Sequence, residues 1–130
     1  GELNSYKIFT AFLDPYKKGM ELAVEEVNAA GGVFGRKLEV VYRDDNGNPG
    51  DAVRAAEELL SRERVHLLMG TFASNVGLAV SDLARQRKVL FIASEPLTRD
   101  TSTWLEVPEY SMIYADTRDG SPSVEIHYLT

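Results

Sequence analysis

Hydrophobic and polar residues alternate along the first hundred residues with the two periods typical of helices and strands. After Asp14-Pro15, apolar residues recur at three- and four-residue spacing, which is the pattern of one buried helix face. These residues are Met20, Ala23, Val24 and Val27. Asp14 can cap free backbone amides and Pro15 suits the first helical turn, while Gly31-Gly32 favours a helix end. The pattern predicts a helix between these two signals.

Helices and strands then alternate with short connections up to about residue 93. The β-branched run Lys37–Arg43 predicts a strand. The elements predicted after it are a helix behind the cap Asn48-Pro49, a strand over Val65–Met69, a helix over Val76–Gln86 and a strand over Val89–Ala93. This order predicts a three-layer α/β domain, with a mainly parallel sheet of at least four strands flanked by helices.

The two ends of the chain differ from this alternation. A strand is expected before the first helix, and periodicity alone points to Tyr6–Leu13. After Trp104 the alternation stops, and Ser111–Ala115 and Val124–Leu129 resemble two strands around a turn-rich segment, which predicts a β-hairpin. We therefore expect a lobe over residues 1–104 and a C-terminal hairpin over residues 105–130, packed on the same domain.

The inward-facing positions of these elements predict the hydrophobic core. With 130 residues and an apolar fraction of 44%, the chain is large enough for one domain with a core of its own. The predicted core residues are Val24, Val27, Val40, Leu59, Val65, Leu67, Leu83, Leu90 and Ile92.

Composition and charge exclude several function classes. The formal net charge is −6, which argues against a nucleic-acid partner, since phosphate binding requires a basic surface. The sequence has no cysteine, which removes disulfides, thiolate catalysis and zinc–thiolate sites. It shows no apolar run of membrane-spanning length and no signal peptide, and an exported protein in its mature form looks the same.

The sequence contains no catalytic constellation, so we predict neither an enzyme nor a bound cofactor. The glycines of Gly31–Gly35 follow a helix, whereas a dinucleotide fingerprint lies between a strand and a helix. His66 and His127 lie in different predicted strands without a partner at metal-ligand spacing. Asp44-Asp45 is typical of a turn with a cap, but it could also hold Mg²⁺. The alternative function is therefore a stand-alone flavodoxin-like or receiver-like signalling module that uses Asp44 and Asp45.

The loop Gly70–Asn75 is the most informative segment for function. It follows a predicted parallel strand and opens a helix, and ligands of open α/β sheets bind outside the carboxyl ends of the strands. A helix start offers unpaired amides and a partial positive charge, which suit a carboxylate. Ser74 or Asn75 would either contact such a ligand or only cap the helix. The loop Ala93–Thr98 should lie beside it.

Four stretches of the sequence resemble the type I periplasmic binding proteins of the branched-chain amino-acid and amide group. They are Pro15–Val41, with its N-A-A-G-G turn, the acidic turn and helix of Arg43–Leu59, the loop of Gly70–Ser81 and the loop of Phe91–Thr98. The resemblance covers about residues 1–104. It implies the first of two α/β lobes that close on a ligand, with the sheet order 2-1-3-4.

Residue by residue, the resemblance implies where this lobe grips its ligand. The carboxylate side would be Ser74 with neighbouring atoms of Phe72 and Asn75, since first lobes of this family usually hold the α-carboxylate and α-amino groups. The second loop offers Ser94 and Glu95, and Glu95 could pair with a ligand ammonium. The family's loop after the first strand supplies an aromatic wall, for which the options are Tyr6, Phe9 and Phe12.

The resemblance also implies partners, location and assembly. It describes a non-catalytic lobe of an ABC-transporter substrate-binding protein for amino acids or related small amides and carboxylates. A second lobe and an ABC permease are its implied partners, and its implied location is periplasmic or extracellular. One lobe covers roughly half of a ligand, so we expect millimolar binding or none. Gly1–Ser5 resembles the end of the first strand, and Val124–Leu129 could fill the rest of that slot, within one chain or in a homodimer by strand exchange.

Overall fold

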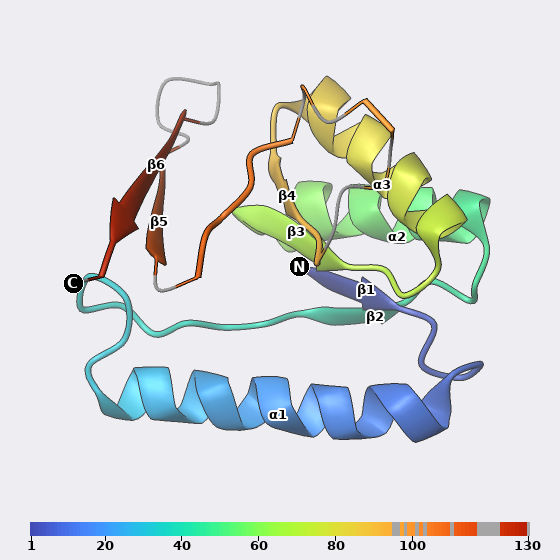
Figure 1. Cartoon of the computed structure of the whole chain (residues 1–130). Coiled ribbons are helices and arrows are strands. Elements are labelled where there is room, and N and C mark those ends of the chain that lie inside the picture. The colour runs from blue at the N-terminus through green and yellow to red at the C-terminus, as the bar shows by residue number, and fades with distance from the viewer. Residues whose placement is uncertain are drawn as a thin grey trace.

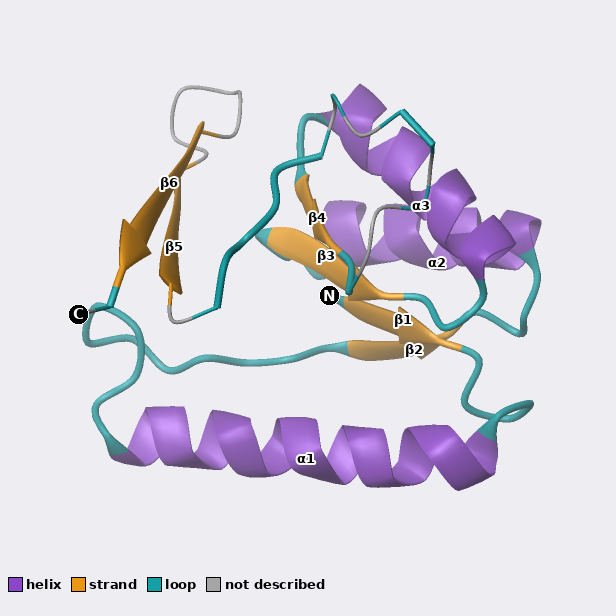
Figure 2. Ribbon diagram, viewed as in Figure 1, coloured by secondary structure: helices purple, strands orange, loops and turns teal. Residues whose placement is uncertain are grey.

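The computed structural model describes residues 1–94, 97, 99–100, 102, 104–109, 111–116 and 123–129. Four strands form a parallel sheet in the order β2-β1-β3-β4, and helix α1 lies on one face while α2 and α3 lie on the other (Figures 1 and 2). The elements of this part are β1 Glu2–Asn4, α1 Thr10–Ala29, β2 Tyr42–Asp44, α2 Pro49–Ser61, β3 Leu67–Gly70, α3 Ser74–Arg87 and β4 Leu90–Ile92. The predicted three-layer α/β fold and its strand order are confirmed.

Strand β1 occupies the centre of the sheet. Its residues pair in parallel with Tyr42–Asp44 of β2 on one side, and Glu2 and Leu3 pair with Met69 and Gly70 of β3 on the other. The first-strand position is therefore filled by the segment that the family resemblance indicated. Val124–Leu129 does not enter it, so the reason for a strand-exchanged homodimer is removed.

The strand predicted over Tyr6–Leu13 from periodicity alone is wrong. The chain turns directly after β1, because the carbonyl of Ser5 accepts hydrogen bonds from the N–H groups of Ile8 at 3.0 Å and Phe9 at 2.9 Å. Helix α1 then begins at Thr10, so Pro15 lies inside the helix and the predicted start at Asp14-Pro15 is also wrong. Two apolar side chains of this segment, Phe9 and Phe12, pack against Phe72 and do not form one face of a strand.

The hydrophobic core lies between the sheet and the pair α2–α3. Leu3 of β1 and Leu68 of β3 point to this side and are fully buried. Their partners on the two helices are Ala52, Ala56, Leu59, Val76, Val80, Leu83 and Ala84. Of the predicted core, Leu59 and Leu83 are buried, which confirms these two residues.

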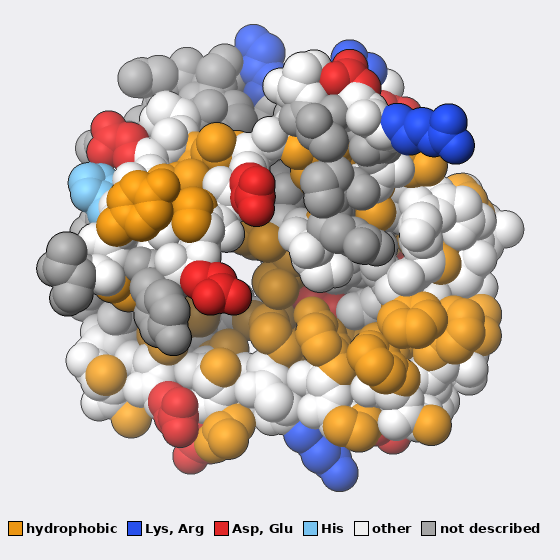
Figure 3. Space-filling view, viewed as in Figure 1, with side chains coloured by type: hydrophobic (Ala, Val, Ile, Leu, Met, Phe, Trp, Pro, Cys, Tyr) orange, Lys and Arg blue, Asp and Glu red, His pale blue; other side chains and the backbone are white. Residues whose placement is uncertain are grey.

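The opposite face of the sheet is hollow, which corrects the rest of the predicted core. A cavity of about 560 Å³ separates α1 from the sheet, and it is visible as the hollow above α1 in Figure 3. Val27 and Ile92 line it and are 36% and 37% exposed. Val65 is partly buried and packs against the core between the sheet and the pair α2–α3. The other predicted core residues are only partly buried, namely Val24, Val40, Leu67 and Leu90. The inward face of α1 was identified correctly, but it faces this cavity and not a packed layer.

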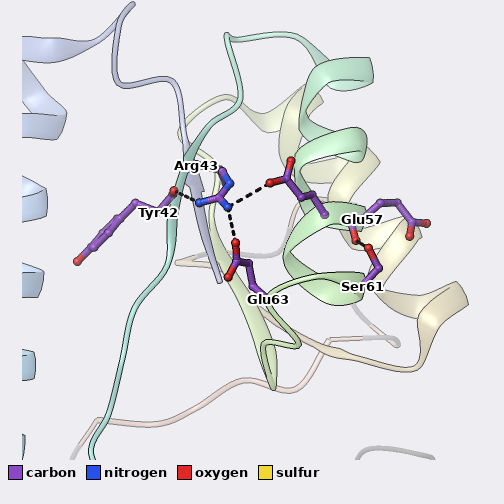
Figure 4. Close-up of polar contacts among 6 residues, drawn as sticks. Tyr42, Arg43, Glu57, Ser61 and Glu63 are labelled. Atoms are coloured by element: carbon purple, nitrogen blue, oxygen red, sulfur yellow. Dashed lines mark hydrogen bonds and ion pairs between the residues drawn. The ribbon is translucent and has the colours of Figure 1, made fainter.

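Local interactions fix both ends of α2 on the core side of the sheet. The side chain of Asn48 caps α2 by accepting hydrogen bonds from the N–H groups of Gly50 at 2.9 Å and Asp51 at 3.1 Å, as the sequence predicted. Arg43 of β2 ties the strand to the end of α2, because its guanidinium contacts Glu63 at 2.8 Å (Figure 4) and Glu58 at 3.2 Å.

Strands β5 (Ser111–Asp116) and β6 (Ser123–Tyr128) form a separate two-stranded sheet. They pair antiparallel from Ser111 opposite Tyr128 to Asp116 opposite Ser123, and residues 117–122 between them lie outside the described residues. Among the described helices, none is long and apolar enough to cross a membrane.

Because only one face of the sheet is packed, truncating an apolar side chain should cost much more stability on that face than on the other. Leu59→Ala should lower the free energy of unfolding by about 2–5 kcal/mol, because it empties a site in the packed layer. Val27→Ala should change it by no more than about 0.5 kcal/mol, since this side chain already faces an open cavity. Urea denaturation measures both values. A cost of several kcal/mol for Val27→Ala would show that α1 is packed on the sheet in solution.

A second prediction concerns the close approach of β3 to β1. Gly70 has φ +106°, and a Cβ there would lie 2.2 Å from the carbonyl oxygen of Leu3. Gly70→Ala should therefore destabilise the fold by more than about 2 kcal/mol. Gly19→Ala is the matched control, because no atom lies within 4 Å of its added methyl group and alanine favours the helix by about 1 kcal/mol. Equal thermal midpoints of the two variants would contradict this account.

Candidate functional site

A cavity of about 410 Å³ opens at the carboxyl ends of β1, β3 and β4. This is the edge of a parallel sheet where ligands of open α/β folds bind. Its lining consists of Asn4, Phe12, Leu13, Tyr16, Met69, Gly70, Thr71, Phe72, Ile92, Ala93 and Ser94. None of the lining residues that the structure describes carries a charge.

Three aromatic rings form one side of this cavity's mouth. The ring of Phe72 lies 4.5 Å from that of Phe9 and 5.1 Å from that of Phe12, measured between centroids. Phe12 and Phe72 also line the cavity. The segment after β1 thus supplies an aromatic wall, made by Phe9 and Phe12 together with Phe72 from the loop after β3.

The loop after β3 brings the start of α3 towards the cavity. Gly70 and Thr71 both have positive φ, and the N–H of Thr71 donates to the carbonyl of Leu3 at 2.6 Å. Ser74 and Asn75 are the first two residues of α3, and Ala73 is the N-cap, with no side-chain cap bond. The capping interpretation of Ser74 and Asn75 is therefore wrong. The first amides of the helix have no intrahelical acceptor.

The remaining predicted site residues lie in different places. Ser94 follows β4 and lines the cavity, as Phe72 does. Ser74 and Asn75 are not among the lining residues. Tyr6 lies on the α1 side of the sheet, where its hydroxyl donates to Glu2 at 2.7 Å. Glu95 lies outside the described residues.

Sequence reasoning missed a buried polar cluster beside the cavity. Glu2 is fully buried in the central strand, and its Oε1 accepts a hydrogen bond from the Asn4 amide nitrogen at 2.5 Å. The hydroxyls of Tyr6 and Tyr16 also donate to Glu2. The ammonium of Lys17 lies over the rings of Tyr6 and Tyr42, at 5.7 and 4.7 Å from their centroids. The alternation of polar and apolar residues in the short segment E-L-N was the sequence signal of this cluster.

Burial shifts the titration of this cluster. Desolvation raises the pKa of Glu2 above its ordinary value, although the hydrogen bonds from the two tyrosines and Asn4 oppose the shift. Burial and the neighbouring Glu2 carboxylate raise the pKa of Tyr16 to about 12. The tyrosines therefore stay protonated at neutral pH and act as hydrogen-bond donors.

The carboxylates of Asp44 and Asp45 hold two loops together. Asp45 is fully buried and accepts from the Ser5 hydroxyl at 2.5 Å and from the Gly47 N–H at 2.8 Å. Asp44 accepts from the N–H groups of Lys7 at 3.0 Å and Asn46 at 2.8 Å. Both carboxylates therefore stabilise the loops that follow β1 and β2, as Asp residues commonly do in turns.

Neither histidine belongs to a metal cluster among the described residues. His66 is exposed, and the side chain of His127 is 54% exposed and lies 3.4 Å from Glu125. The described part of the chain contains no group of three or more histidine or carboxylate side chains that could hold a metal ion.

The raised pKa of Glu2 predicts a pH dependence of stability. The native state holds the Glu2 proton more tightly than the unfolded chain, so stability falls as the pH rises from about 4.5 through the raised pKa. Glu2→Gln should reduce this fall, measured by urea denaturation at several pH values from about 4.5 to neutral. Carboxylates common to both proteins cancel in the comparison. A pH dependence that Glu2→Gln leaves unchanged would contradict this assignment.

Comparison with known protein families agrees with this geometry. Residues 8–129 match the family described as periplasmic binding protein, so the match continues past Trp104 through β5 and β6. Among curated proteins, the chain is similar to Leu/Ile/Val-binding protein homolog 3 of Brucella melitensis, with 37% identity over 82 residues, or 63% of this chain. It is also similar to homolog 7 of Brucella suis, with 41% identity over 71 residues, or 55% of this chain.

Solved structures give the same picture. The branched-chain amino acid transporter substrate-binding protein LivJ of Streptococcus pneumoniae, in complex with isoleucine, superposes with a TM-score of 0.64 at 28% identity, over 70% of this chain and 26% of that one. An ABC-transporter substrate-binding protein of Desulfitobacterium hafniense, in complex with Leu, superposes with a TM-score of 0.61 at 26% identity, over the same shares.

The chain spans only part of these proteins, namely 22% of the first Brucella relative and 18% of the second. The family match covers nearly all of the chain, and the sheet order and the cavity at its carboxyl edge are those that the resemblance implied. The family is a non-catalytic component of transporters. The chain belongs to the periplasmic binding protein family, and its relatives are branched-chain amino-acid-binding proteins of ABC transporters.

Proposed function

We propose that this chain is the first lobe of an exported solute-binding protein and that it holds an amino acid or a related small carboxylate. The observation that carries the proposal is the cavity at the carboxyl edge of the sheet, bordered by the aromatic wall and by the loop that opens α3. In the matched structures of LivJ and of the Desulfitobacterium protein, the ligands are isoleucine and Leu. A ligand of this size fits a cavity of about 410 Å³.

The ligand carboxylate is assigned to the start of α3. The unpaired amides of Ser74 and Asn75 and the positive end of the helix dipole favour an anion there. The Ser74 hydroxyl adds a donor on the same turn, and Ser94 supplies another from the neighbouring strand end. These groups can hold a carboxylate without a charged side chain from the described lining.

The apolar part of the ligand is assigned to the aromatic wall. Phe12 and Phe72 line the cavity and yet remain 62% and 46% exposed. Burying this surface against an aliphatic side chain is favourable by about 25 cal/mol for each Å². The wall therefore favours leucine-like ligands over alanine or glycine.

A second lobe completes the site in the proposed full-length protein. One lobe leaves the cavity open, whereas binding pockets usually bury about 70–90% of a ligand's surface. Closure of the second lobe would supply the missing contacts, and an ABC permease would receive the closed complex. We therefore infer weak binding for this chain by itself, with a dissociation constant in the millimolar range. A signalling module that uses Asp44 and Asp45 is disfavoured, because these carboxylates already hold the loops of β1 and β2.

An NMR titration with L-leucine, L-alanine and glycine tests this function. We expect millimolar binding that weakens from leucine to glycine, with shifts confined to the cavity and the start of α3. Phe72→Ala should weaken leucine binding about three- to tenfold and change glycine binding little, because it removes only apolar contact. Submicromolar binding, or shifts confined to the α1 cavity, would contradict the proposal.

A further inference from the structure

The cavity between α1 and the sheet is a second hollow, separate from the cavity at the carboxyl edge. Its volume of about 560 Å³ lies within the range of about 300–1,000 Å³ that is typical of small-molecule sites. Met69 and Ile92 line both cavities, so these two side chains lie between them. Arg64 and Val65, which precede β3, also line the α1 cavity. It therefore extends from the wall of Met69 and Ile92 towards the amino edge of the sheet.

Contacts at both ends of α1 hold the helix across this hollow. Near its start, Leu13 is buried and the Tyr16 hydroxyl donates to Glu2. Near its end, the Asn28 amide nitrogen donates to the Leu38 carbonyl at 2.9 Å, and the Leu38 N–H donates to the Asn28 amide oxygen at 2.7 Å. The helix is thus anchored on either side of the cavity, and the fold itself defines the open space.

The interior of the α1 cavity is apolar. Val24 and Val27 line it from the helix, and Val40 and Leu67 line it from the side of the sheet. Water in such a space finds few polar partners, so an alkyl chain would displace it favourably. The lining residues Met20 to Val27 span about 10 Å of helix, which is about the length of an extended chain of eight carbons.

The mouth of the α1 cavity carries an excess of positive charge, although the whole chain has a formal net charge of −6. Three lining side chains are cationic at neutral pH, and they are Arg36, Lys37 and Arg64. None of the three forms an ion pair with another described residue. Of the two carboxylates in the lining, Glu63 is paired with Arg43 at 2.8 Å, which leaves Glu39. This mouth therefore attracts an anion.

We propose that the α1 cavity binds an amphiphile with one alkyl chain and an anionic head group, for which octanoate is the model ligand. The alkyl chain lies between α1 and the sheet, with its end near Met69 and Ile92. The head group lies at the mouth, near Lys37 and Arg64. This site goes beyond the proposed function, because it lies on the other side of Met69 and Ile92 and takes a different class of ligand.

Titration of the 130-residue chain with octanoate, butanoate and octylamine tests this site. NMR follows the methyl signals of Val24 and Val27, which line the cavity, and calorimetry gives the affinities. Octanoate should shift the signals of both valines. Butanoate should bind at least about tenfold more weakly, because its shorter chain buries less apolar surface. Octylamine should bind at least about threefold more weakly than octanoate, because the basic mouth repels its head group.

Two variants and a matched control locate the bound alkyl chain and its head group. Val24→Phe places a larger side chain in the cavity and should weaken octanoate binding at least about tenfold. Leu22→Phe is the control and should keep the affinity, because Leu22 is an exposed residue of the same helix that is not among the described lining residues. Lys37→Glu reverses one charge at the mouth and should remove the preference for octanoate over octylamine. If Val24→Phe fails to fold, the valine methyl shifts and Lys37→Glu decide.

The possible outcomes separate this inference from the proposed function. Octanoate shifts confined to Phe72 and the start of α3 would place the ligand in the carboxyl-edge cavity and overturn the inference. Equal affinities for octanoate and octylamine, equal losses in Val24→Phe and Leu22→Phe, or absence of octanoate binding would overturn it as well. None of these results bears on the proposed function, which is tested with leucine, and a failure of leucine to bind leaves the octanoate site standing.

Discussion

The placement of β1 in the middle of the sheet is the constraint on which the rest of the structure depends. Three residues, Glu2–Asn4, pair with β2 on one side and with β3 on the other. A central strand must satisfy backbone donors and acceptors on both edges. Two further hydrogen bonds join the strand to the loops that follow β3 and β2. The Leu3 carbonyl accepts from the N–H of Thr71 at 2.6 Å, and the Asn4 carbonyl accepts from the N–H of Asp45 at 3.0 Å. The loops that border the functional cavity are fixed to this strand.

Alternation along this strand gives the sheet two different faces. Leu3 points towards α2 and α3 and belongs to the packed core. Glu2 and Asn4 point to the other side, where α1 stands off behind a cavity of about 560 Å³. Burying a carboxyl group is costly without hydrogen-bond partners, and Tyr6, Tyr16 and Asn4 supply them. The packed apolar core of the lobe therefore lies in one layer, and the other layer holds the buried polar groups.

The same division explains why the cavity at the carboxyl edge of the sheet has an apolar side and a polar side. Its aromatic wall comes from the segment after β1 and the loop after β3, which meet because their strands are neighbours. Its polar side comes from Asn4 at the end of β1, Thr71 after β3 and Ser94 after β4. None of the lining side chains that the structure describes is charged, so the proposed ligand contacts on this lobe come from the start of α3 and from hydroxyl groups.

The sequence by itself determined the fold class, the order of the elements and the position of the functional edge. These follow from local patterns, such as the cap at Asn48 and the loop of Gly70–Asn75. The sequence also indicated Phe72 and Ser94, which line the cavity, because both follow predicted strands. The strand predicted over Tyr6–Leu13 failed for a physical reason, since alternating apolar residues describe an aromatic wall as well as a strand face.

The tertiary structure alone decided which inward faces are packed and which are open. Val27 has the same helical spacing as a core residue, but no layer of the described chain covers it. It also decided the role of Glu2 and Asn4, because a three-residue segment carries too little periodicity to reveal a central strand. The pairing of Glu2 with tyrosines from α1 and the preceding loop depends on contacts that only folding creates. Local pattern specifies elements, whereas burial and hydrogen-bond partners are properties of the assembled layers.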